Sequence, residues 1–80
     1  MNLTVEKIEE QFNLYLKGEK KLEAIKEWAN KYDVYKEELV FSPNENKKEL
    51  LKWIKIFKNI KIEKTQKSDI ENLYREFLNN

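Results

Sequence analysis

The sequence predicts an all-α fold, a compact bundle of four helices that residues 1–80 form as a single helical domain. Apolar residues recur at spacings of three and four along most of the chain, which is the period of one face of an α-helix. The 80 residues include only one Gly and one Pro, and 39% of them are charged. This composition favours helices with charged outer faces over a sheet of tight hairpins.

The first helix is predicted to begin after Asn2 or Thr4, since either residue can cap an N-terminus. Its apolar side chains share one face at helical spacing. They are Val5, Ile8, Phe12, Tyr15 and Leu16. Gly18 follows this face and is the only Gly in the chain. A Gly at that place favours a left-handed cap that ends the helix.

Residues 19–30 carry the second helical pattern. Its apolar face is formed by Leu22, Ile25, Trp28, Ala29 and Tyr32. Large aromatic side chains are mostly buried, so we interpret Trp28 as a core anchor; an exposed Trp that binds a partner is the alternative. Residues 31–41 then mix Tyr, acidic and apolar side chains. They form either an irregular connection or a short extra helix between the second and third helices.

Residues 42–62 form the third predicted helix and the centre of the packing. Ser42 is the expected N-cap, with Pro43 at the first helical position and Glu45 three residues after the cap, which is the pattern of a capping box. Apolar residues cover so much of this helix that it needs neighbours on more than one side. These residues are Leu50, Leu51, Trp53, Ile54, Ile56, Phe57 and Ile60.

A second capping box, from Ser68 to Glu71, is predicted to open the fourth helix. This helix carries a single apolar stripe made of Ile70, Leu73, Tyr74, Phe77 and Leu78. Large apolar side chains on such faces fill the core of a small bundle. Those that we expect to be buried are Trp28, Trp53, Ile54, Phe57, Leu73 and Phe77.

The residue types that carry most enzyme chemistry are missing. The chain has no His and no Cys, which removes the usual acid–base and thiol groups and the usual zinc ligands. One Gly cannot build a phosphate-binding loop, and Ser42 and Ser68 are explained as helix caps. We therefore expect a non-enzyme with no metal and no cofactor. The sequence also shows no signal peptide and no membrane-spanning segment, so we expect a cytoplasmic protein without a membrane partner.

Charge is unevenly distributed, although the net charge is only +1. Residues 1–45 hold ten acidic residues and seven lysines, whereas residues 46–80 hold nine basic and five acidic residues. Lys48, Lys52 and Lys55 share one face of the third helix, and such a stripe can follow phosphates. The chain shows no clear helix-turn-helix signature and no set of base-reading side chains. The pattern therefore favours a solvated helix face over nucleic-acid binding.

Several short patterns occur in a fixed order over residues 15–78. They are Tyr15-Leu16-x-Gly18, Ala24-Ile25, Trp28-Ala29, Leu50…Ile54…Phe57, Asn59-Ile60-Lys61-Ile62, Ser68-Asp69-Ile70, Leu73 and Phe77-Leu78. In this order and spacing the chain resembles small helical bacterial immunity proteins, which are encoded beside secreted or contact-delivered toxins. The resemblance implies a protein that neutralises a cognate toxin, most often by covering its active site or substrate surface.

A protein of that kind needs aromatic anchors and complementary charge rather than chemistry of its own. Many toxins act on nucleic acids through basic clefts, and acidic side chains can fill such a cleft. We therefore predict a partner-binding surface on the connector between the second and third helices, for a cognate toxin such as a nuclease. Its residues are Tyr32, Asp33, Tyr35, Glu37 and Glu38, with Glu9 and Glu10 as a second acidic group.

Two other functions stay open. One is a small phage- or mobile-element-type inhibitor or adaptor, which also binds a protein. The other is a weak nucleic-acid-binding module that uses the lysines of the third helix. In each case we expect a monomer, and a toxin gene next to this one would favour the immunity function.

Overall fold

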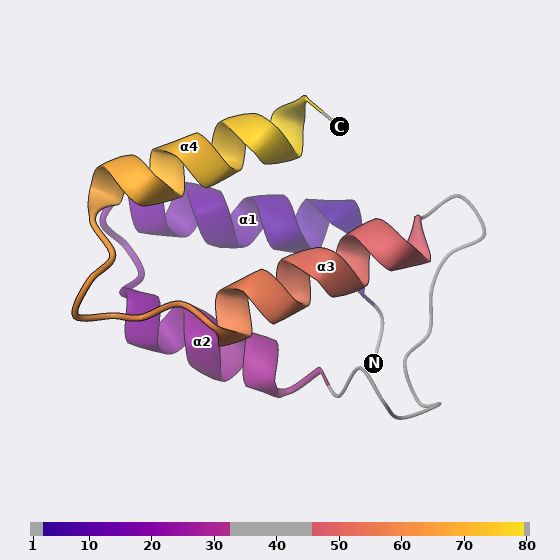
Figure 1. Ribbon diagram of the computed structural model, residues 1–80, viewed down its shortest axis with the longest axis horizontal. Helices are drawn as coiled ribbons and strands as arrows, with labels where there is room; N and C mark the ends of the chain where they lie inside the picture. Colours follow the sequence, from indigo (N-terminus) through magenta and orange to yellow (C-terminus); the bar gives the residue numbers. More distant parts are fainter. Residues whose placement is uncertain (1–2, 33–45, 80) are drawn as a thin grey trace.

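Four helices in succession make up the part of the chain that the structure describes, residues 3–32 and 46–79 of a computed structural model (Figure 1). They are α1 (Val5–Leu16), α2 (Leu22–Asn30), α3 (Lys47–Lys58) and α4 (Lys67–Leu78). The predicted all-α four-helix fold is confirmed over these residues. The predicted extra helix and the capping box of Ser42 and Pro43 fall outside the described residues.

The helices pack as two antiparallel pairs, α1 with α4 and α2 with α3 (Figure 1). Helix α3 also contacts α1, so it has neighbours on two sides, as its broad apolar surface predicts. The chain directions bring the starts of α1 and α3 and the end of α4 to the same end of the bundle (Figure 1). Three helix ends therefore meet there.

An aromatic cluster around Phe12 joins the two pairs of helices. The ring centroid of Phe12 lies 5.2 Å from that of Phe57 and 5.5 Å from that of Phe77. The ring of Trp53 packs edge-on against Phe12 at 5.8 Å. Aromatic pairs in such geometries add about 0.5–1.5 kcal/mol each beyond the burial of their surface. Rings from α3 and α4 therefore surround a ring that belongs to α1.

Most of the predicted core side chains are buried. Those confirmed are Trp53, Ile54, Phe57 and Phe77. The prediction of burial is wrong for Trp28 and Leu73, which are half-buried because they pack against the core from its edge. The ring of Trp28 lies 5.0 Å from that of Tyr32 and so covers the core instead of filling it.

Both predicted ends of α1 are confirmed. Thr4 caps its start with a side-chain hydrogen bond. Gly18 has a φ of +78°, and its N–H donates to the carbonyl of Tyr15 at 3.0 Å. The N–H of Glu19 donates to the carbonyl of Leu14 at 2.9 Å. This pair of bonds defines a Schellman motif, which satisfies the last carbonyls of the helix and needs the left-handed residue that Gly supplies.

Helix α3 is shorter than predicted at both ends. Asn46 is its N-cap, and the side chain of Asn46 accepts the N–H of Glu49 at 3.3 Å. The helix ends at Lys58 instead of continuing to residue 62. Asn is as good an N-cap as Ser, so the presence of a capping residue does not by itself fix where a helix starts.

Helix α4 begins before the predicted cap. Gln66 is the N-cap, and its N–H donates to the carboxylate of Asp69 at 2.9 Å. Ser68 therefore lies inside the first turn, and the prediction that it caps the helix is wrong. Asp69 makes the return bond that the prediction assigned to Glu71, because it lies three residues after the true cap.

Candidate functional site

The predicted connector surface is described only at its first residue. Tyr32 is 3% exposed and packs in the core, with its ring against Trp28. Its side chain therefore offers little contact area to a partner. The other four predicted residues lie outside the described residues, and they are Asp33, Tyr35, Glu37 and Glu38. The prediction for these four stays a prediction.

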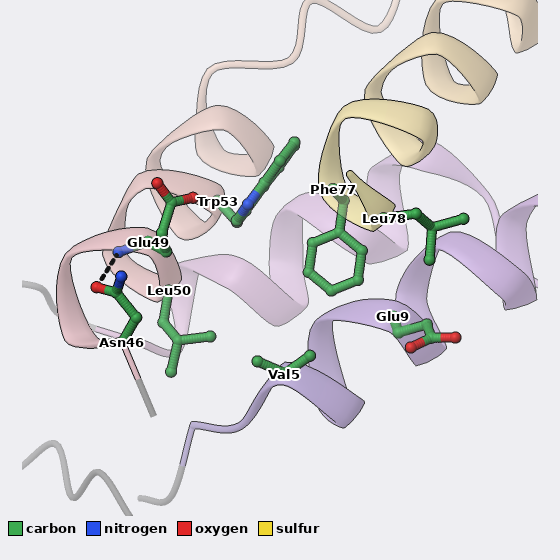
Figure 2. A pocket seen from close by; sticks show the side chains of 8 residues that line it. All are labelled: Val5, Glu9, Asn46, Glu49, Leu50, Trp53, Phe77 and Leu78. Atoms are coloured by element: carbon green, nitrogen blue, oxygen red, sulfur yellow. Dashed lines mark hydrogen bonds between the residues drawn. The ribbon is translucent and has the colours of Figure 1, made fainter. Parts of the chain in front are cut away.

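A hollow of about 440 Å³ opens at the end of the bundle where α1 and α3 begin and α4 ends (Figure 2). We call it the α1–α3–α4 groove. Its lining residues are Val5, Glu9, Asn46, Glu49, Leu50, Trp53, Phe77 and Leu78. Pockets that hold ligands typically measure about 300–1,000 Å³, so the groove is large enough to accept side chains from a binding partner.

The floor of the groove is apolar and held in place by the core. Trp53 and Phe77 are buried, and their rings meet edge to face at 5.5 Å. Val5 and Leu78 are 39% and 56% exposed and are the two exposed large apolar side chains among the described residues. Both line the groove. Apolar exposure in the described part of the molecule is thus concentrated at one place.

Glu9 brings one carboxylate to the groove from α1 (Figure 2). The hydroxyl of Tyr74 donates to its Oε1 at 3.3 Å, and the ring of Tyr74 stacks on Phe12 at 5.1 Å. Burial raises the pKa of Tyr74, and the charge of Glu9 beside the hydroxyl raises it further. The packing of Tyr74 on the core therefore restrains the position of this carboxylate.

Glu49 brings a second carboxylate from α3, and the Phe77 ring lies between it and Glu9 in Figure 2. Its backbone N–H is held by the Asn46 cap. Oε2 of Glu49 is shielded from solvent and has no hydrogen-bond partner among the described residues. Burying an acceptor without a donor costs free energy, so this oxygen is an incomplete feature of the groove.

The lysines of α3 have different environments. Nζ of Lys58 donates to the carbonyl of Tyr32 at 2.6 Å and so satisfies backbone just beyond α2. Nζ of Lys52 lies 5.5 Å from the ring of Trp53, and Lys48 and Lys55 are exposed. Three exposed lysines, Lys48, Lys52 and Lys55, therefore remain on the face that the sequence identified.

Two further features lie outside the groove. A second hollow of about 310 Å³ has no exposed large apolar side chain at its rim. It is lined by Ile60, Thr65, Asp69, Asn72, Leu73 and Glu76.

The side chain of Lys20 donates to the buried side chain of Gln11, and its Nζ lies 6.0 Å from the centroid of the Trp28 ring. Burial lowers the pKa of Lys20. This cluster satisfies a buried amide between α1 and α2.

The described residues contain no group of three or more His, Cys, Asp or Glu that could hold a metal ion. None of the four helices has the length and apolar character that a membrane crossing requires. Comparison of the chain with models of known families, with curated protein sequences and with solved structures finds no match. The groove must therefore be interpreted from its own geometry.

Several residues of the groove were singled out in the sequence, but nothing in the sequence placed them at one site. Glu9 was in the second acidic group, whereas Val5, Trp53 and Phe77 were assigned only to apolar faces. Glu49 was not singled out. A usable signal was present, because Val5 and Leu78 lie at the first and last positions of their helices, where an apolar side chain has fewer neighbours to cover it.

Proposed function

We propose that the protein is a non-catalytic, protein-binding domain of the immunity type, which neutralises a cognate bacterial toxin and contacts it through the α1–α3–α4 groove. The observation that carries this proposal is the concentration of exposed apolar side chains, Val5 and Leu78, at one groove with carboxylates on two of its helices. Exposed apolar groups gathered in this way mark interaction sites more often than scattered ones do.

The groove has the components of a binding hot spot. Trp53 and Phe77 give it a rigid aromatic floor, and Val5 and Leu78 can be buried further by a partner. Glu9 and Glu49 supply charge beside the apolar area. Binding energy in interfaces comes mainly from such desolvated centres, while charges set the orientation and the association rate.

The choice of toxin neutralisation over other protein binding depends on the resemblance to immunity proteins. The helical fold agrees with that resemblance, and a basic cleft in a nuclease toxin would suit the acidic groove. A phage-type inhibitor or adaptor would use the same contact surface. The two functions differ only in the partner.

The test uses the product of the gene next to this one. We expect that product to be toxic when expressed alone and harmless when co-expressed with this protein, with direct binding measured by calorimetry. The paired variant Val5→Ser/Leu78→Ser should lose both protection and binding while its circular dichroism stays helical. A neighbouring product that is not toxic, or is toxic but neither bound nor neutralised, would overturn the immunity function.

The predicted connector surface is tested in the same assay. Reversal of Asp33, Glu37 and Glu38 to Lys should leave the helical content unchanged. If this triple variant loses protection while the groove variant keeps it, the contact surface is the connector and not the groove. Loss in both variants would indicate one continuous interface.

The exposed lysines of α3 favour one second candidate, a weak nucleic-acid-binding module. Affinity would then come from phosphate contacts of Lys48, Lys52 and Lys55 and would fall steeply with salt. Binding of duplex or single-stranded DNA that weakens with salt, is still measurable near physiological salt and disappears in the triple Lys→Gln variant would support this candidate over toxin binding.

A further inference from the structure

We infer that the α1–α3–α4 groove accepts an amphipathic helix of the partner, with an apolar side chain seated between Val5 and Leu78 and a Lys or Arg paired with Glu49. This inference rests on the proposed protein-binding function and names the chemistry of the segment that is bound. Three properties of the groove lead to it: its apolar rim, its incomplete carboxylate and its helical walls.

The apolar rim requires an apolar group in the bound segment. Val5 and Leu78 lie on two different helices, α1 and α4, and Phe77 forms the floor between those helices and α3 (Figure 2). A side chain that enters from solvent can contact both rim residues and the floor at once. Burial of the exposed Leu78 side chain then favours binding through the hydrophobic effect.

The incomplete carboxylate favours a cationic donor in the bound segment. Oε2 of Glu49 is shielded from solvent and lacks a hydrogen-bond donor among the described residues. A Lys or Arg of the partner that reaches the Glu49 carboxylate would form a charge-assisted hydrogen bond with it, which is among the stronger polar contacts. Glu9 is already held by the hydroxyl of Tyr74. We therefore assign the main cation contact to Glu49 and a supporting electrostatic role to Glu9.

The helical walls of the groove argue against recognition by strand addition. Every described lining residue belongs to a helix or, in the case of Asn46, to a helix cap, so these residues offer no strand edge for an extended peptide to join. A common mode that needs no strand edge is a helix laid in a groove, which presents apolar anchors at spacings of three, four and seven residues. An anionic segment is disfavoured, because Glu9 and Glu49 would repel it.

The probe is a synthetic, helix-forming peptide of about 16 residues, with a Leu stripe flanked by lysines. The matched control peptide has Glu in place of each Lys. Titrations of the full chain, followed by NMR, should shift backbone resonances of the groove residues with the basic peptide only. Equal binding of both peptides, or no binding of either, would overturn the inference.

Substitutions then test the cation contact. Glu49→Gln keeps the shape of the side chain and should weaken the basic peptide about five- to tenfold at low salt, with a smaller difference at high salt. Glu27→Gln is the matched control, because Glu27 is exposed on α2 and does not line the groove. A peptide with one Lys replaced by Gln completes a double-mutant cycle. A coupling of zero at every Lys position would show that Glu49 does not hold the cation.

The outcomes separate this inference from the proposed function. Charge-selective peptide binding without toxin neutralisation would leave the groove chemistry intact and remove the immunity function. Toxin neutralisation that is unchanged in Glu49→Gln would do the reverse. Sedimentation of the chain alone tests a second copy as the occupant, since a dimer that dissociates in Leu78→Ser would overturn the assignment to a partner helix.

Discussion

The two ends of α3 carry similar apolar side chains but have different surroundings. Near the C-terminus of α3, Phe57 is enclosed by the rings of Phe12 and Trp28, and Lys58 donates a hydrogen bond to the backbone carbonyl of Tyr32 just beyond α2. Toward its start, Leu50 and Trp53 form part of the open groove. The C-terminal end of α3, which we call the closed end, is part of the packed core. The N-terminal end, which we call the open end, has an apolar floor and a carboxylate oxygen without a donor among the described residues.

This difference shows how one amphipathic helix can serve both stability and recognition. At the closed end, helix α2 packs against α3, and Lys58 donates a hydrogen bond to the carbonyl of Tyr32. At the open end, the first turn of α1 and the last turn of α4 leave Val5 and Leu78 uncovered. Substitutions at the closed end should therefore change the free energy of unfolding, and those at the open end should change binding.

The largest expected effect is at the closed end. Phe57→Ala should reduce the free energy of unfolding by about 3–5 kcal/mol, because it removes a buried ring and leaves a cavity among other aromatics. That is a large part of the stability of a small domain. Urea denaturation followed by circular dichroism measures it. A loss below about 1 kcal/mol would show that Phe57 is not enclosed in solution.

Lys58→Met should cost about 1 kcal/mol, since it removes the hydrogen bond to the Tyr32 carbonyl but keeps the aliphatic stem. The effect stays small because Lys58 is half-buried and water can replace part of the bond. Lys55→Met is the control on the same helix, because Lys55 is exposed. Equal denaturation midpoints for the two variants would show that the hydrogen bond from Lys58 to the Tyr32 carbonyl adds nothing to stability.

At the open end, Val5→Ser and Leu78→Ser should each change the free energy of unfolding by about 0.5 kcal/mol or less, because both side chains are already exposed. The same variants should abolish binding of the basic helical peptide. Chemical denaturation and NMR titration of one protein sample give both values. A loss of stability comparable to that of Phe57→Ala would mean that the groove is closed in solution.

The contrast between the two ends also explains which features could be predicted from sequence. Spacing and the single turn Gly were enough to find four helices and the end of α1 at Gly18, and local chemistry narrowed the first cap to Asn2 or Thr4, of which the structure shows Thr4. Helix α3 starts later than predicted, after the good capping residue Asn46, and α4 starts earlier than predicted, after Gln66, a residue type that helix caps do not favour. The groove was not recognised because it forms where three helix ends meet, and apolar residues at single helix ends, such as Val5 and Leu78, do not show that those ends lie together.

The smallest expected effect concerns Tyr74, which links the core to the open end through Glu9. Burial and the nearby Glu9 charge raise the pKa of Tyr74 above its usual value of 10.0. The folded state therefore favours the protonated phenol. The resulting stability is fully present below pH 10 and is lost as the pH rises through the raised pKa of the folded state.

Tyr74→Phe isolates this contribution. Burial raises the pKa of Tyr32 and lowers that of Lys20, so both groups also make stability depend on pH in the alkaline range, in opposite directions. Both remain in the variant, and their effects cancel when it is compared with the wild type at each pH. Above pH 10 the variant should lose stability less steeply than the wild type, as measured by urea denaturation from pH 8 to 11. Parallel curves would mean that Tyr74 ionises as easily in the folded chain as in the unfolded one, and that the Tyr74–Glu9 bond does not hold this side of the groove.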